Sequence, residues 1–135
     1  MDAKGITPIL NVSDFNYTII WFEKIGWKKN WEWGTPPKFG CVGSGNSEIF
    51  LCVNGQGGRG KGKNTATFNH ENGETSDRGV WLSIWVDDVD SIYTKCLEQD
   101  VEIMYKPENM PWNVREFHIR HPDGHVFRLS QHLPC

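Results

Sequence analysis

Histidine and carboxylate side chains gather in one short stretch near the end of the chain. His118, His121 and His125 lie close together, and Glu116 precedes them. Histidine is the commonest metal ligand in proteins, so a metal site is one interpretation. On a strand, however, His118 and His121 point to opposite faces, because side chains alternate. His121 and His125 flank a turn at residues 122–124 and can approach one another, whereas His118 beside Glu116 predicts hydrogen-bonding groups in a cavity.

Other carboxylates allow two further interpretations. Glu48 and Glu116 are candidates for a general acid and base pair, if the fold brings them close enough together. Asp87, Asp88 and Asp90 cluster at the expected start of a helix, where the helix dipole favours negative charge. A calcium loop needs more oxygen ligands at regular spacing, so helix capping is the better interpretation of the three aspartates.

A glycine-rich stretch nearly matches a phosphate-binding loop. Gly57, Gly62 and Lys63 have the spacing of that motif, but Asn64 stands where serine or threonine is required. The residues that follow show no helical pattern, and residues 54–79 as a whole are rich in glycine, asparagine, threonine and charge. A loop of this length inside a domain tends to be functional or mobile, and we interpret it as a flexible cationic loop.

Tryptophan is strongly over-represented, with seven in 135 residues. Some of these side chains must belong to the core, because aromatic residues contribute much of the buried apolar area. Seven exceed what a core of this size needs, and Trp81 and Trp85 flank Ser83 on one face of an expected strand. Aromatic side chains with polar neighbours are typical of a ligand cavity.

The elements that would position these side chains follow a pattern that occurs twice. Apolar residues alternate with other residues over 6–12 and again over 80–86, an offset of 74 residues, which predicts two half-buried strands. An aspartate follows each strand, and Asp14 and Asp88 predict the N-caps of helices that end near residues 25 and 99. The repeat therefore predicts one supersecondary unit used twice.

Further strands complete both copies. They are expected after the first helix at 27–33, 39–44 and 48–53, and after the second at 101–105, 115–120 and 125–130. The predicted fold class is α+β, with two βαβββ modules in a single domain of residues 1–135. Module 1 covers 6–53, module 2 covers 80–131, and the loop 54–79 joins them. The modules are expected to form a concave mixed sheet with helices on the outer face.

The sheet face away from the helices is the expected cavity face. On strands of period two it carries a mixed, aromatic-rich set of side chains, which is more typical of a binding surface than of a core. The alternative is that this face is half exposed or packs against another subunit. The set comprises Thr7, Ile9, Asn11, Glu48, Phe50, Cys52, Trp81, Ser83, Trp85, Glu116, His118, Arg128 and Ser130.

Charge and composition exclude several classes of protein. A net charge of −3 argues against a general nucleic-acid-binding protein. No apolar run approaches the ~20 residues of a membrane span, and no signal-peptide pattern is present. The four cysteines show no CxxC spacing, so neither a zinc site nor a disulfide framework is indicated. These features predict a cytoplasmic protein that binds neither nucleic acid nor membranes.

The sequence resembles the vicinal oxygen chelate superfamily, which includes glyoxalases, extradiol dioxygenases and bleomycin-resistance proteins. The resemblance rests on the run from Pro8 to Asp14, on residues 25–27 at the end of the first helix, and on segments 86–90 and 121–124. It covers nearly the whole chain. Residues 111–130 and the pairing of two tryptophans on one strand are most similar to the bleomycin-resistance branch.

The resemblance also implies where a metal would be bound. The superfamily's metal enzymes place one ligand, usually His, Glu or Gln, on each of four strands. The matching positions here hold Thr7, Phe50, Trp81 and Arg128. Phenylalanine and tryptophan cannot coordinate a metal, and arginine repels a cation. We therefore expect no metal, no cofactor and no glyoxalase or dioxygenase chemistry.

By resemblance to bleomycin-resistance proteins, two aromatic rings grip the flat tail of a drug. Phe39 and Trp112 match these positions, while Trp33, Trp81 and Trp85 would shape the groove and contact a cationic tail. The polar contacts would come from Ser83, Glu116, His118 and Arg128. The resemblance further implies a homodimer whose aromatic-lined grooves between the subunits bind the ligand, with an exchanged N-terminal strand, and Pro8 suits an edge strand.

The expected function is metal-independent sequestration of a flat, cationic antibiotic or related small molecule. One alternative is a lyase or dioxygenase that uses other ligands, such as His118 or Glu48. Another is a small-metabolite binding protein with no link to resistance.

Overall fold

The structure is a computed structural model, and it describes residues 1–53 and 79–134. The chain forms two compact units, Met1–Ala66 and Thr67–Cys135. The near-match to a phosphate-binding loop at Gly57–Asn64 and almost all of the predicted loop 54–79 lie outside the described residues. No helix among the described residues is long and apolar enough to span a membrane.

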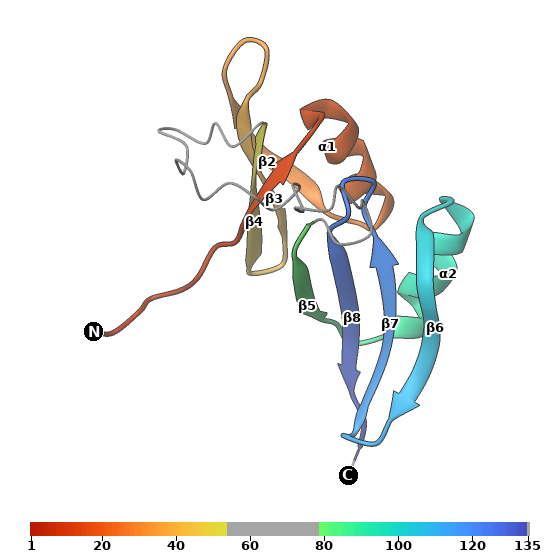
Figure 1. The fold of residues 1–135 in the computed structure, drawn as a ribbon. Coiled ribbons are helices and arrows are strands. Elements are labelled where there is room, and N and C mark those ends of the chain that lie inside the picture. The colour runs from red at the N-terminus through yellow and green to blue at the C-terminus, as the bar shows by residue number, and fades with distance from the viewer. Residues whose placement is uncertain (54–78, 135) are drawn as a thin grey trace, which may run out of the picture. The chain divides into compact units, whose positions relative to one another are not determined.

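The first unit is a four-stranded mixed sheet covered on one face by a helix (Figure 1). The strands lie in the order β1-β4-β3-β2, with β1 parallel to β4 and the other neighbours antiparallel. The elements are β1 (Ile9–Val12), α1 (Phe15–Lys24), β2 (Lys28–Trp33), β3 (Phe39–Ser44) and β4 (Ser47–Val53).

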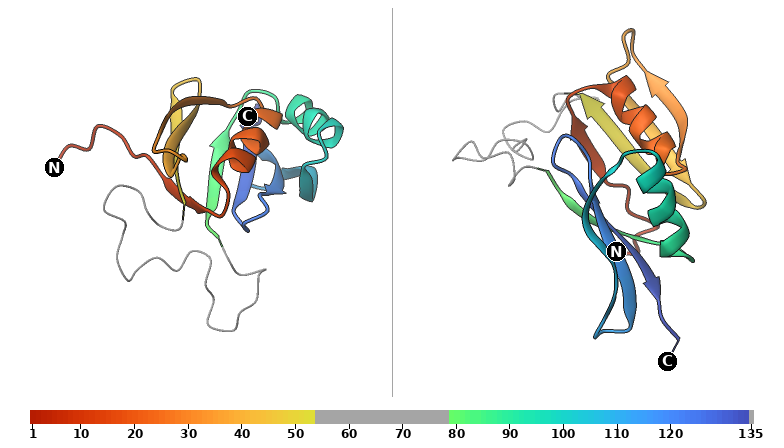
Figure 2. Two further views of the ribbon diagram at one scale, coloured as in Figure 1. Left: turned by 90° about the horizontal axis from the view of Figure 1, so that it is seen from above. Right: turned by 90° about the vertical axis from the view of Figure 1, so that its right-hand side faces the viewer.

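The second unit repeats this topology. Its strands lie in the order β5-β8-β7-β6, and again only the first pair is parallel. Both views of Figure 2 show one helix beside the sheet of each unit. The elements are β5 (Trp81–Trp85), α2 (Val89–Glu98), β6 (Glu102–Met110), β7 (Val114–Arg120) and β8 (Val126–His132). The predicted α+β class with two βαβββ modules is confirmed.

Both helices begin where the sequence predicts. Asp14 accepts a hydrogen bond from the backbone N–H of Tyr17 (2.8 Å), and Asp88 accepts one from the N–H of Ser91 (3.2 Å). Each aspartate has extended backbone and satisfies an N–H that the first helical turn leaves unpaired. Gly26, with φ at 93°, follows the end of α1, where the left-handed conformation favours glycine.

The core of each unit lies between its helix and its sheet. In the first unit Phe22 is fully buried together with Leu10, Val42 and Leu51. Burying a side chain of this kind stabilises the fold by about 1.5–3 kcal/mol. Gly40 on β3 makes the packing close, because an added Cβ would lie 2.4 Å from the ring of Phe15 on α1. In the second unit Phe117, Ile119, Phe127 and Leu129 are buried in the same way.

Two strand boundaries differ from the prediction by three residues or more, and the others differ by at most two. β1 begins at Ile9 rather than at residue 6, and Pro8 contributes only its carbonyl, which accepts from Phe50 N (2.9 Å). β6 continues to Met110 rather than ending at residue 105. Register shifts on either side of Tyr105 interrupt the alternation that a prediction relies on. The longer β6 carries several residues of the pocket described below.

The strands pair in corresponding registers within the two sheets, so the residues of one sheet can be matched with those of the other position by position. Ile9 pairs with Phe50, which pairs with Cys41, which pairs with Trp31. The corresponding row of the second unit runs Ser83, Arg128, His118, Tyr105. The next row is Asn11, Cys52, Phe39, Trp33 in the first unit and Trp85, Ser130, Glu116, Glu108 in the second. One backbone frame therefore carries an aromatic face in one unit and a charged face in the other.

Candidate ligand-binding pocket

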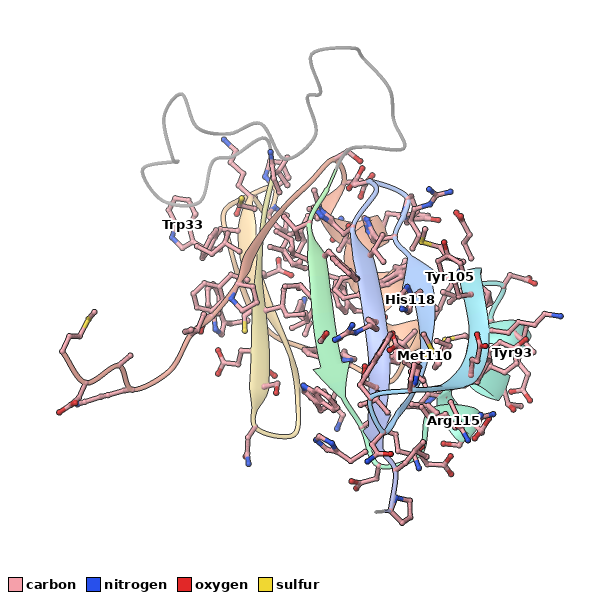
Figure 3. The ribbon with its side chains drawn as sticks, turned by 60° about the horizontal axis from the view of Figure 1, so that its bottom comes forward. Trp33, Tyr93, Tyr105, Met110, Arg115 and His118 are labelled. Carbon is pink, nitrogen blue, oxygen red and sulfur yellow. The ribbon has the colours of Figure 1, made fainter. Side chains whose placement is uncertain are left out.

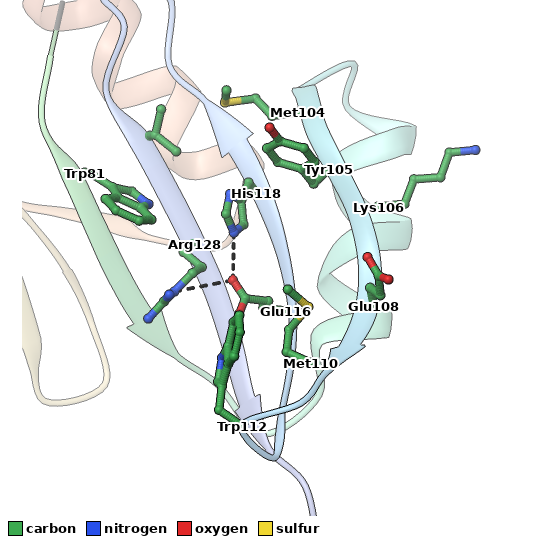
Figure 4. A pocket seen from close by; sticks show the side chains of 11 residues that line it. Trp81, Met104, Tyr105, Lys106, Glu108, Met110, Trp112, Glu116, His118 and Arg128 are labelled. Atoms are coloured by element: carbon green, nitrogen blue, oxygen red, sulfur yellow. Dashed lines mark hydrogen bonds and ion pairs between the residues drawn. The ribbon is translucent and has the colours of Figure 1, made fainter. Parts of the chain in front are cut away.

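A pocket of about 500 Å3 opens on the face of the second unit's sheet that is turned away from α2 (Figure 4). This volume suits a small organic molecule. Its lining combines aromatic and thioether side chains with a few charged groups. The lining residues are Trp81, Met104, Tyr105, Lys106, Glu108, Met110, Trp112, Glu116, His118, Val126 and Arg128.

A buried carboxylate forms the polar floor of the pocket. Glu116 is only 4% exposed, and its two oxygens contact three neighbouring side chains. Trp112 Nε1 donates to Oε1 (3.2 Å), and His118 Nε2 lies 2.7 Å from Oε2. Arg128 Nε lies 3.5 Å from the same Oε2. Figure 4 shows the last two contacts as dashed lines. A buried carboxylate of this kind is stable because its charge is paired and hydrogen-bonded.

Arg128 is held on three sides. Its Nε donates to Ser83 Oγ on β5 (3.0 Å) and lies near Glu116 on β7. Its guanidinium carbon lies 5.7 Å from the ring centroid of Trp81, within the range of a cation–π contact. The side chain is 26% exposed, so the guanidinium reaches the pocket while its orientation is fixed by neighbours.

Large aromatic side chains form the walls, and they are exposed. Trp81 is 66% exposed, Tyr105 63% and Trp112 56%. Tyr105 meets the ring of His118 edge to face, with centroids 5.1 Å apart, and Figure 3 shows the two side by side on β6 and β7. Exposed aromatic groups gathered around a concave surface are typical of a binding site.

The first unit carries an aromatic cluster of its own. Trp31, Phe39 and Phe50 contact one another with ring centroids 5.3 to 5.6 Å apart. Trp33 lies on the same strand as Trp31 and is strongly exposed at the sheet edge (Figure 3). Three of the predicted site residues, Trp33, Phe39 and Phe50, thus belong to this unit rather than to the pocket of the second unit.

The remaining predicted site residues lie in the second unit, and most of them meet. Trp81, Trp112, Glu116, His118 and Arg128 line the pocket, and Ser83 holds Arg128. Trp85 does not line it. Its indole stacks on His132, with centroids 4.3 Å apart and planes 8° from parallel.

The predicted aromatic sandwich of Phe39 and Trp112 involves two different units. Phe39 packs on Trp31 and Phe50 in the first unit, and Trp112 hydrogen-bonds to Glu116 in the second. The sandwich therefore stays a prediction.

Several pocket residues were missed by the sequence reasoning, most of them on β6. Met104, Tyr105, Lys106, Glu108 and Met110 lie on the part of β6 around and beyond its register shifts. The 74-residue offset was a usable signal for one of them, because it matches Tyr105 with Trp31. Trp31 itself, missed in the first unit, has the same parity as Trp33.

His121 and His125 belong to a tight hairpin rather than to the pocket. Both are buried, with ring centroids 5.8 Å apart. His121 Nδ1 accepts from the backbone N–H of Asp123 (3.0 Å), and His125 Nδ1 accepts from that of Val80 (3.1 Å). Burial lowers the pKa of His121 to about 4, against the opposing attraction of the Asp123 carboxylate. These histidines close a turn between β7 and β8.

The two glutamates considered as an acid and base pair belong to different units. Glu48 accepts from Cys41 Sγ (3.4 Å) in the first unit, and burial together with this contact raises the pKa of the thiol to about 11. Glu116 is bonded within the second unit. The aspartates at the start of α2 have structural partners: Asp88 caps the helix, and Asp90 forms an ion pair with Arg115 (2.9 Å).

The residues at the four positions implied for metal ligands do not fit a metal site. Thr7 precedes β1, Phe50 packs in the aromatic cluster, and Arg128 makes a cation–π contact with Trp81. Among the residues that the structure describes, no group of three or more His, Cys, Asp or Glu side chains could hold a metal ion. Three of these side chains are aromatic or cationic, and Thr7 offers only a hydroxyl group.

Comparisons with solved structures show the same fold over nearly the whole chain. The bleomycin-binding protein complexed with bleomycin is 18% identical, covering 96% of this chain and 98% of that one, with a TM-score of 0.69. The bleomycin resistance determinant encoded on the transposon Tn5 is 17% identical, covering 96% and 98%, with a TM-score of 0.71. TioX from Micromonospora sp. ML1 is 15% identical, covering 97% and 100%, with a TM-score of 0.76.

Sequence comparison identifies the family. A search of curated proteins gives no significant match. The model of the Glyoxalase/Bleomycin resistance protein/Dioxygenase superfamily matches residues 6–129, and the name of that superfamily covers both enzymes and bleomycin resistance proteins. Since the match spans most of the chain and the two βαβββ units have the corresponding fold, the protein belongs to the Glyoxalase/Bleomycin resistance protein/Dioxygenase superfamily.

Proposed function

We propose that this protein binds a flat aromatic small molecule non-covalently in the pocket of the second unit and sequesters it without chemical change. The observation that carries the proposal is the set of exposed aromatic walls, Trp81, Tyr105 and Trp112, around a floor whose buried carboxylate is already hydrogen-bonded. A flat ring stacked on such walls gains about 0.5–1.5 kcal/mol per contact beyond the area it buries.

Bleomycin-like antibiotics are the proposed ligand class. Similarity to a bleomycin-binding protein and to a bleomycin resistance determinant supports this class through the shared fold. The side chains at the implied metal positions favour binding over glyoxalase or dioxygenase chemistry, since none of them is a metal ligand of that kind. The cationic character expected of the ligand stays a prediction.

A titration with recovery of the ligand tests this function. Metal-free and metal-bound bleomycin are added to the full chain while tryptophan fluorescence is followed. The drug is then recovered, and its molecular mass is measured by mass spectrometry. Saturable quenching with micromolar affinity or better and unaltered drug supports sequestration. The absence of quenching at high drug concentration removes bleomycin as the ligand, and a chemically altered drug indicates an enzyme.

The alternative of an enzyme has one observation in its favour. His118 Nε2 lies 2.7 Å from Glu116 Oε2 in the pocket, and a carboxylate that orients an imidazole is an arrangement used in general base catalysis. Metal analysis of the purified protein tests the other form of this alternative, since stoichiometric divalent metal supports a metalloenzyme with non-standard ligands.

The proposal includes a homodimer with an exchanged N-terminal strand in the cytoplasm. Residues 1–7 are exposed and run away from the sheet of the first unit (Figure 1), and β1 is an edge strand of that sheet. A segment of this kind is available for pairing with a second copy. Cys41 and Cys96 are buried free thiols, as is usual in a reducing compartment.

A further inference from the structure

The negative and positive charges on the pocket floor differ in how accessible they are to a ligand. Glu116 carries the negative charge, but it is 4% exposed and its oxygens face Trp112, His118 and Arg128. A cationic group on a ligand would have to displace one of these donors to reach the carboxylate. The negative charge of the floor is therefore satisfied by the protein itself.

Arg128 differs, because only one of its nitrogens is engaged. Nε makes the contacts to Ser83 and Glu116, whereas among the described residues of this unit the two terminal nitrogens have no hydrogen-bond partner. These nitrogens carry four N–H donors in one plane, and the side chain lines the pocket. The guanidinium group is therefore fixed in orientation, and its two terminal nitrogens form a planar donor fork that can bind a ligand.

The aromatic face of Trp81 is also engaged by this arginine. The guanidinium carbon lies 5.7 Å from the indole centroid, so the protein supplies the cation of the cation–π contact itself. A cationic ligand at this wall would meet a like charge, while an anionic or oxygen-rich group would meet an oriented donor fork. The arrangement at Arg128 thus favours a ligand of the opposite charge to the one expected from the sequence.

We propose that the pocket recognises a planar carboxylate attached to the flat ring of its ligand, held by the terminal nitrogens of Arg128 while the ring lies against the aromatic walls. The inference rests on the part of the proposed function that places a flat aromatic molecule in this pocket, and it specifies the polar group of that molecule. Arginine suits this task because its planar fork matches the two oxygens of a carboxylate. Ser83 and Glu116 act as positioning residues for the fork.

Three probes that share the same aromatic ring system but differ in charge separate the effect of the ligand's charge from that of its shape. Naphthalene-2-carboxylate, naphthalene-2-carboxamide and naphthalen-2-ylmethylammonium are titrated into the full chain by calorimetry near neutral pH. We expect the carboxylate to bind about tenfold more tightly than the neutral amide, as a charge-assisted bidentate contact warrants, and the ammonium to bind most weakly.

Variants assign the preference to Arg128. Arg128→Gln is expected to lose the tenfold preference while its affinity for the amide stays within about threefold of the parent protein. Arg128→Lys keeps the charge without the fork and is expected to lose most of the preference. Lys95→Gln removes one positive charge on the exposed side of α2, away from the pocket. This variant is expected to keep the preference for the carboxylate. Circular dichroism checks that each variant is folded.

The outcomes separate this inference from the proposed function. Equal binding of all three probes, tighter binding of the ammonium, or a preference that survives in folded Arg128→Gln overturns the carboxylate inference but leaves an aromatic-binding pocket. Loss of the preference in Lys95→Gln overturns it too, since general attraction by net charge would then explain the result. If none of the probes binds although bleomycin quenches the tryptophan fluorescence, the carboxylate inference fails and the proposed function stands. If neither the probes nor bleomycin bind, both fail.

Discussion

At the scale of single residues, the pocket is organised by hydrogen bonds to one carboxylate. Parity on the strands predicts that Glu116 and His118 share a face, and the two side chains are in contact. The bond from Trp112 to Glu116 could not be predicted in this way. It depends on the turn between β6 and β7, where Asn113 has a φ of 64° and redirects the chain. Local turn geometry of this kind leaves little trace in an alternation pattern.

Replacing Trp112 tests the wall of the pocket. Trp112→Ala removes an exposed stacking surface, so we expect the affinity for bleomycin to fall by about 0.5–1.5 kcal/mol. Calorimetry measures the affinity, and circular dichroism shows whether the fold is kept. Trp85→Ala is the matched comparison, because this indole stacks on His132 and does not line the pocket. Equal losses of affinity for bleomycin in the two variants, or no loss of affinity in Trp112→Ala, would refute the role of Trp112 as a stacking wall of the pocket.

His121 makes the stability of the fold depend on pH. Its pKa is lowered from 6.5 to about 4 in the folded protein, because burial disfavours the charged ring. Between these values the unfolded chain binds a proton that the folded chain does not. Stability is therefore complete above about pH 6.5 and decreases as the pH falls, by up to ~1.4 kcal/mol per pH unit, until about pH 4.

Urea unfolding at several pH values measures this contribution. His121→Asn keeps an acceptor for the backbone N–H of Asp123 but does not titrate, so the difference in stability from the parent protein should narrow as the pH falls. His132→Asn alters an exposed histidine and should leave the slope in place. A parent protein as stable near pH 4 as near pH 7 would contradict the prediction.

At the scale of elements, the sheet register explains why two similar modules differ in chemistry. The row that contains Phe50 and Cys41 in the first unit contains Arg128 and His118 in the second. Alternation and helix caps predict the elements, because both signals are local in sequence. The extent of β6 is set by pairing with β7 across register shifts, which no local signal records. Most of the unpredicted pocket residues are on that strand.

The contact between α1 and β3 can be tested at Gly40. An added Cβ would lie 2.4 and 2.6 Å from two ring carbons of Phe15 and 2.9 Å from the carbonyl oxygen of Trp31. Gly40→Ala should therefore destabilise the protein by about 1–3 kcal/mol, the usual cost of overpacking. Gly5→Ala is the matched control, because nothing lies within 4 Å of its Cβ position. Unchanged stability of Gly40→Ala in urea would show that the helix moves aside at little cost.

At the scale of the whole molecule, the sequence predicts that the same topology occurs twice. It predicts only in part how charged side chains are distributed over the two copies. Alternating residues and the caps Asp14 and Asp88 specify both βαβββ units. Which tryptophans line one pocket depends on contacts between strands distant in sequence. Trp81 and Trp112 reach the pocket, whereas Trp85 pairs with His132 and Trp33 belongs to the other unit. Composition indicates a binding surface, but only tertiary contacts select its members.

The N-terminal segment connects the single chain to its proposed dimer. Residues 1–7 are exposed, with Ile6 at 91%, and they precede an edge strand that pairs on one side only. If this segment is exchanged between copies, removing residues 1–7 should convert a dimer into a monomer, because the deleted apolar contact has no substitute. Light scattering coupled to size exclusion measures the mass. Lys4→Gln alters the same segment without removing Ile6 and should remain dimeric. A monomeric parent protein would exclude the dimer. A dimer that persists after the deletion would exclude exchange through this segment and direct the search for an interface to the exposed aromatic residues of the first unit.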